Sequence, residues 1–300
     1  MHESYEAPQI HGKEATRRSS KESFGHLNSI LHKVSGEISD ELRDEYGIEG
    51  LIGDDCGIRM EAYKEINPAV YEKDKKKAEQ KEEEWSGVKN EGTRKFYCEK
   101  YGLAEDISDG EIVERHLEEM SKEKPKKLEM MMTILLHKAF RDGYFVVRSA
   151  KSDDYFGGID NVIVNKETGD VICAFDEVRE NSRSNRRNEK DEKVTARARS
   201  GGAELIYGFT VLEGKVKLRS MGNLPLFCLG LDGNEYDELA NAIEYDGNSG
   251  LNEVEQRFLE KILASIEEQK DRLLSDPSVQ RNKAIVDNLN KVSELTSHRA

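Results

Sequence analysis

Apolar residues recur at helical spacing in the first part of the chain. Phe24, Leu27, Ile30 and Leu31 predict a short amphipathic helix over residues 24–34. The glycine-rich residues 47–60 predict turns or a short strand. Another helix is expected to begin at Asn67-Pro68, because proline is tolerated at the first helical position. Its charged residues are typical of a solvated helix.

Two further helices border the centre of the chain. The spacing of Ser108 and Glu111 is that of a capping box, and an apolar face follows that includes His116, which we interpret as a packing residue. After a break near Pro125, apolar residues predict a helix that ends at Asp142-Gly143. Its apolar positions are Leu128, Met131, Met132, Leu135, Leu136 and Phe140.

Beyond that helix the pattern becomes typical of strands. Three strands are predicted, over residues 144–147, from about 158 to 164, and over 171–178, with a hairpin between the last two in which Gly169 suits a positive φ. A helix over residues 189–199 and a strand over 204–211 follow. This order predicts an α+β (or α/β) unit, in which a mixed sheet is flanked by helices.

The last part of the chain returns to helical spacing. One helix is predicted from about Leu251 to a stop before residues 275–277, and another around Ile285 to Val292. They form a predicted helical hairpin that either packs on the core or mediates a homodimer. The chain is thereby divided into a disordered tail (1–23), a mainly helical region (24–124), a central domain (125–232) and a C-terminal helical region (233–300).

Composition narrows the class of protein. The net charge of −14 over 300 residues argues against uniform coating of nucleic acid, but it permits a local basic groove. The four cysteines form no C-x-x-C pair and the seven histidines lack metal-site spacing, so we expect free thiols in a reducing cytoplasm and no zinc site. The chain shows no membrane-spanning stretch and no signal peptide pattern, so we expect no membrane partner.

Acidic residues occur on three elements of the central unit. Glu129 is on the predicted helix, Asp160 starts the second strand, and Asp176-Glu177 closes the third. With a four-residue hairpin turn, Asp160 lies opposite Phe175 and shares a face with Glu177, the arrangement we prefer. With a three-residue turn, Asp176 faces Asp160 instead. Carboxylates from adjacent strands predict a site for Mg²⁺ or Mn²⁺.

A basic segment follows these acids. Between residues 179 and 199 it holds eight basic side chains against four acidic ones. Such a segment suits contact with a phosphate backbone, although it is equally typical of a solvated loop and helix face. The basic residues are Arg179, Arg183, Arg186, Arg187, Lys190, Lys193, Arg197 and Arg199.

Together, the helix with Glu129, the GGID strand with Asp160, the strand ending FDEVR and the basic helix resemble the PD-(D/E)XK nuclease superfamily. The resemblance covers about residues 125–212. It implies a restriction-endonuclease-like αβββαβ core with an acid on the first helix, an aspartate on the second strand and D/E-x-K on the third. It also implies a metal-dependent hydrolase that acts on phosphodiester bonds, with DNA preferred to RNA as the expected substrate.

The chain departs from that pattern at the lysine. The third-strand motif ends in Arg179 (after Glu177) or Val178 (after Asp176). Arginine holds a phosphate but cannot accept a proton as a base, so Lys190 or Lys193 of the following helix is the expected substitute. Two alternatives stay open: a degenerate module of the same fold that binds nucleic acid or protein without cleavage, and a helical interaction or scaffold protein.

Overall fold

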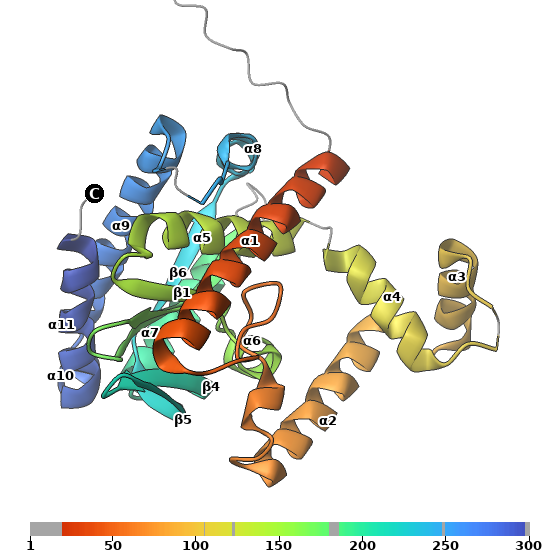
Figure 1. Ribbon diagram of the computed structural model, residues 1–300, viewed down its shortest axis with the longest axis horizontal. Coiled ribbons are helices and arrows are strands. Elements are labelled where there is room, and N and C mark those ends of the chain that lie inside the picture. The colour runs from red at the N-terminus through yellow and green to blue at the C-terminus, as the bar shows by residue number, and fades with distance from the viewer. Residues whose placement is uncertain (1–19, 105, 122–123, 180–185, 248–249, 298–300) are drawn as a thin grey trace, which may run out of the picture.

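The computed structural model describes residues 20–104, 106–121, 124–179, 186–247 and 250–297 (Figure 1). The side chains of residues 20–21, 121, 124–125, 179 and 186–187 lie outside this description. Residues 1–19 of the predicted tail (1–23) therefore lie outside the described part of the chain. The first helix, α1 (Ser20–Tyr46), is longer than predicted. Ile38 and Leu42 are buried, so the apolar spacing continues well past residue 34.

Residues 47–63 form turns with an isolated bridge between Ile52 and Ile58 and a short 3₁₀ helix, η1 (Met60–Tyr63). Three helices follow: α2 (Pro68–Ser86), α3 (Glu91–Tyr101) and α4 (Asp109–Ser121). Together they form an arm, residues 68–121, which extends from one side of the molecule (Figure 1). The predicted caps of α2 and α4 are confirmed, because Asn67 accepts from the Val70 amide and Ser108 bonds Glu111.

A four-stranded mixed sheet lies at the centre of the molecule. The helix α5 (Lys124–Phe140) precedes β1 (Tyr144–Arg148), and the one- to two-turn helix α6 (Lys151–Gly157) leads to β2 (Asn161–Asn165). The third strand is β3 (Val171–Arg179), which is followed by α7 (Arg186–Arg199). The strand order is β1-β2-β3-β6, and β6 (Leu226–Leu231) runs parallel to β3. The mixed α+β class is thus confirmed.

The predicted fourth strand takes a different place from the one expected. It exists as β4 (Ala203–Leu212), but it pairs only with β5 (Lys215–Leu224), in a separate antiparallel ribbon. The strand beside β3 is β6, whose apolar sequence LFCLGL carries no alternation that distinguishes a strand from a buried helical turn. The ribbon is therefore an insertion between α7 and the last strand of the sheet.

The register between β2 and β3 also differs from the preferred prediction. The Asn165 amide donates to the Asp170 carbonyl, as a four-residue turn requires, and Gly169 has the expected positive φ of 70°. A register shift between Ile163 and Val164 then moves the pairing by one residue, so that Asn161, and not Asp160, is the partner of Phe175. An extra residue in one strand of a pair has this effect.

The C-terminal helices pack on the sheet. After α8 (Gly233–Ala242), α9 (Glu253–Leu274) ends before Ser275 as predicted, and α10 (Pro277–Gln280) and α11 (Lys283–Ser297) follow. One apolar core extends from α1 through the sheet to α11, whereas the arm has a small core of its own. That small core consists of Val88, Cys98, Ile112 and Val113. None of the helices described is long and apolar enough to cross a membrane.

Candidate metal centre

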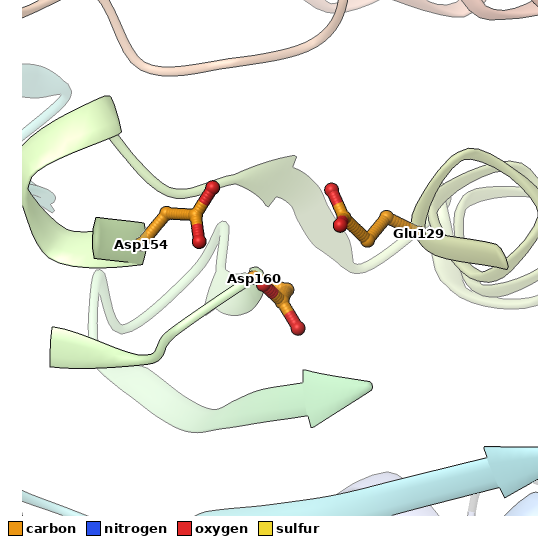
Figure 2. Close-up of side chains that lie close together, drawn as sticks. All are labelled: Glu129, Asp154 and Asp160. Carbon is orange, nitrogen blue, oxygen red and sulfur yellow. The ribbon is translucent and has the colours of Figure 1, made fainter. Parts of the chain in front are cut away.

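Three carboxylates from three different elements meet beside the end of β1. Glu129 on α5, Asp154 on α6 and Asp160 just before β2 each place one oxygen within 4.8 Å of the other two. Figure 2 shows the side chains of Asp154 and Glu129 pointing toward one another, with Asp160 between their parent helices. Two predicted acids thus lie together with a third, Asp154, that sequence reasoning did not single out.

Backbone hydrogen bonds hold Asp160 just before β2, at the end of the β2–β3 pair that is away from the turn. Its amide donates to the Phe175 carbonyl at 2.7 Å, and its own carbonyl accepts from Ser149 at 2.9 Å. Its Oδ2 accepts a hydrogen bond from the Glu177 amide at 2.7 Å. The carboxylate is therefore fixed between the ends of two neighbouring strands.

Asp154 is positioned by its neighbour Asp153. The buried Asp153 carboxylate accepts hydrogen bonds from the amides of Ile206 and Tyr207 in β4, at 2.8 and 2.9 Å. These bonds anchor α6 to the ribbon, and Gly158, at φ 55°, ends the helix. Because successive helical residues point in different directions, Asp154 is free to face Glu129 while Asp153 faces the ribbon.

Glu129 lies between two cations. Its Oε2 accepts from the Arg148 guanidinium and pairs with the Lys126 ammonium, each at 2.7 Å. Arg148 is buried and also donates to Asp55 at 3.0 Å. This arginine, the last residue of β1, was not predicted as part of the site. It fixes the direction in which the Glu129 carboxylate points.

Glu177 is buried next to Asp160 and is not one of the three converging carboxylates. The Thr133 hydroxyl donates to Asn161 Oδ1, and Asn161 Nδ2 donates to Glu177 Oε1, both at 2.8 Å. The other carboxyl oxygen, Oε2, is buried and has no hydrogen-bond partner among the described residues. A buried carboxyl oxygen without a donor is costly when ionised, so Glu177 has capacity for a proton or a cation.

Asp176 points away from Glu177 and contacts the basic helix. The Lys190 ammonium of α7 donates to Asp176 Oδ1 and to the Glu177 carbonyl. Arg197 donates to the Gly157 carbonyl at the end of α6. Burial raises the pKa of Asp176 above its ordinary value, although the charges of Lys190 and Arg197 oppose that rise. A lysine therefore lies beside the acids although the third strand provides none.

Other predicted residues lie elsewhere. Lys193 is exposed, and no described hydrogen bond or ion pair joins it to the acids. Arg199 forms an ion pair with Asp276, at 2.8 Å, which ties α7 to the C-terminal helices. Arg183 lies outside the described residues, as do the side chains of Arg179, Arg186 and Arg187.

The acids share a strongly negative environment. Burial, with Glu129 and Asp176 nearby, raises the pKa of Asp160 to about 6, and burial with Asp160 nearby raises that of Asp154 to about 7. Burial and the Asp160 charge also raise the pKa of Glu177 well above its ordinary value. Burial alone lowers the pKa of Lys190, but Asp176 and Asp160 outweigh it, so the net pKa is raised. Protons or a cation would relieve this repulsion.

The centre opens into a cleft of about 890 Å³ between the arm and the body of the molecule. Glu129, Asp154 and Arg148 line one side of it, and Trp85 of α2 and Met120 of α4 line the other. Since two of the three carboxylates line the cleft, a ligand there has direct access to them.

The sequence contained a usable signal for Asp154. Gly157-Gly158 after AKSDDYF is a typical helix end. A short helix at this position directs the side chains of Asp153 and Asp154 to different sides. No sequence signal pairs Arg148 with Glu129, because that contact depends on how α5 packs on β1.

Comparisons of the chain with models of protein families, with curated proteins and with solved structures found no match.

Proposed function

We propose that the protein is a divalent-metal-dependent nuclease that hydrolyses phosphodiester bonds of nucleic acid. The observation that carries this proposal is the convergence of Glu129, Asp154 and Asp160 within 4.8 Å, from two helices and a strand start. Carboxylates this close repel one another unless a proton or cation lies between them.

The residues present fit Mg²⁺ or Mn²⁺. All three converging groups are carboxylates, and hard cations prefer such oxygen ligands. The Oε2 of Glu177, which is buried and has no partner in the described part of the chain, adds a further oxygen beside Asp160. Glu129, Asp154 and Asp160 would hold the ion, and Glu177 would support it. When bound, such an ion lowers the pKa of a water molecule and neutralises charge on a phosphodiester.

The surrounding cations have separate tasks in this proposal. Arg148 and Lys126 orient Glu129 through their 2.7 Å contacts. Lys190, whose pKa is raised, remains an ammonium at neutral pH. It therefore cannot accept a proton, but it can stabilise negative charge that develops on a phosphate, with Asp176 holding it in place.

The element order supports a restriction-endonuclease-like core. The series α5, β1, β2, β3, α7 and β6 follows the αβββαβ pattern if α6 and the β4–β5 ribbon are insertions. The parallel pairing of β6 with β3 supports the same assignment. This finer fold assignment, the cytoplasmic location and nucleic acid as partner remain parts of the proposal.

A second candidate function has a specific observation in its favour. Lys190 is engaged by Asp176 and by the Glu177 carbonyl, and Lys126 already pairs with Glu129. These pairings neutralise the acids without a metal, as expected for a module that binds nucleic acid or protein and no longer cleaves it.

Cleavage assays distinguish the two candidates. Labelled DNA and RNA, single-stranded and duplex, are incubated with Mg²⁺, Mn²⁺ or EDTA. We expect metal-dependent cleavage that falls more than about 100-fold in Asp160→Asn and Asp154→Asn, since even supporting residues of metal sites contribute about 10- to 100-fold. Asp287→Asn, an exposed acid on α11, is the matched control. Cleavage that survives EDTA or both site variants contradicts the nuclease proposal, and binding without cleavage favours the second candidate.

A further inference from the structure

The wall of the cleft that faces the acids carries one aromatic ring that is open to solvent, and a second exposed ring lies on α6. Trp85 of α2, which lines the cleft, is 55% exposed, and Phe156 of α6, the residue after the cleft-lining Tyr155, is 46% exposed. The Trp85 ring meets the Tyr155 ring edge to face, with centroids 4.8 Å apart, so its position is fixed by packing. Large aromatic side chains that are exposed but held in place are suited to stacking with a ligand.

Lysines alternate with these rings. Lys81 lies over the Trp85 ring at 5.2 Å and Lys77 over the Phe156 ring at 5.9 Å, while Lys75 lines the cleft itself. Within residues 73–77 four lysines accompany a single aspartate. This part of α2 is therefore locally basic in an acidic protein.

Two of the glutamates that follow on α2 are engaged by neighbours. Glu82 accepts from the Tyr155 hydroxyl at 2.7 Å and pairs with Lys151 at 2.8 Å. Glu83 pairs with Lys89 at 2.7 Å. Their negative charge is thus partly neutralised beside the aromatic rings, which lowers the repulsion of a polyanion.

We propose that this surface, formed by Trp85, Phe156, Lys75, Lys77 and Lys81, binds single-stranded nucleic acid. Unpaired bases stack on the two rings and backbone phosphates lie near the lysines, a combination typical of single-strand binding. Trp85 and Lys75 line the same cleft as Glu129 and Asp154, so the strand runs from this surface toward the candidate centre. Cleavage of that strand rests on the proposed function, whereas its binding does not.

The exposed rings favour a single strand over a duplex. A base can stack on a protein ring only when it is not stacked and paired within a helix. The aromatic face would contribute little to duplex binding, where phosphate contacts dominate.

The chain contains a built-in reporter for this contact. Trp85 is the one tryptophan in the sequence. In EDTA, which prevents metal-dependent cleavage, titration with an oligothymidylate is expected to quench tryptophan fluorescence saturably, and the same strand in a duplex is expected to bind more weakly. By fluorescence anisotropy of a labelled strand, Trp85→Ala is expected to weaken binding roughly 5- to 150-fold.

Matched variants separate stacking from folding. Trp85→Phe keeps a stacking ring and is expected to retain most of the affinity. Phe96→Ala removes an aromatic side chain of similar exposure, 56%, on α3 of the same arm and outside the cleft, and is expected to bind as wild type. Circular dichroism and urea unfolding identify any variant that is not folded.

Three results would overturn the proposal: absence of quenching, duplex binding at least as tight as single-strand binding, and equal affinities of Trp85→Ala and Phe96→Ala. Binding that quenches Trp85 without any cleavage in Mg²⁺ or Mn²⁺ would leave this inference standing and refute the proposed function. Metal-dependent cleavage with unchanged Trp85 fluorescence would support the proposed function and refute this inference.

Discussion

Replacing Asp160 with asparagine is expected to stabilise the metal-free protein. The pKa of Asp160 in the folded protein is about 6, above its ordinary value of 3.8. The folded state therefore binds the proton more tightly than the unfolded chain does, so the free energy of unfolding falls as pH rises from about 4 to about 6 and stays lowered above that range. The asparagine side chain does not ionise, so the variant avoids this loss of stability.

The size of the effect follows from the two pKa values. A difference of about 2 pKa units corresponds to about 3 kcal/mol. Because Asp160 shares its environment with Asp154 and Glu177, we expect a gain of roughly 1–3 kcal/mol at pH 8 and about half of it at pH 5. The asparagine oxygen can still accept the hydrogen bond that the Glu177 amide donates to Asp160.

Urea unfolding in EDTA at pH 8 and pH 5 measures this difference. The exposed Asp287→Asn is the control, and its free energy of unfolding should stay within about 0.5 kcal/mol of wild type at both pH values. If Asp160→Asn is no more stable than wild type at pH 8, or if the gain is as large at pH 5, the carboxylates do not repel one another as described.

Two other predictions concern the same centre. Mg²⁺ is expected to raise the melting temperature more at pH 8 than at pH 6, because Asp154 and Asp160, with pKa values of about 7 and 6, must lose protons to bind it; an equal rise at both pH values would argue against these ligands. Arg148→Met is expected to lower the free energy of unfolding by about 1–3 kcal/mol at pH 7, since Glu129 then keeps only the Lys126 ammonium as a partner among the described residues. In urea unfolding, the exposed Arg219→Met is its control, and a loss below 1 kcal/mol would contradict this role.

Local patterns predicted most helices and the strands of the hairpin. The apolar spacing in α5 and the stop of α9 before Ser275 follow from contacts within one element, which sequence periodicity reports directly. The same holds for the capping residues of α2 and α4. The division of the chain into four regions stays a prediction.

Strand pairing and register between elements far apart in the sequence were not predictable in the same way. The partner of β3 is β6 and not β4, because strand pairing depends on the whole sheet. The shift near Ile163 places Asn161 opposite Phe175, so the register could not be read from the length of the turn alone. Asp160 and Glu129 were predicted from their elements, whereas Asp154 required the short helix α6.

The unequal cores on the two sides of the cleft have a dynamic consequence. The acids are attached to the core that extends from α1 to α11, whereas the outer part of the arm depends on the small cluster around Val88 and Ile112. Segments with few buried apolar contacts open locally at a lower free energy than global unfolding requires. Backbone amides of α3 and α4 should therefore exchange with deuterium earlier than those of the sheet, and the cleft can widen while the carboxylates keep their arrangement.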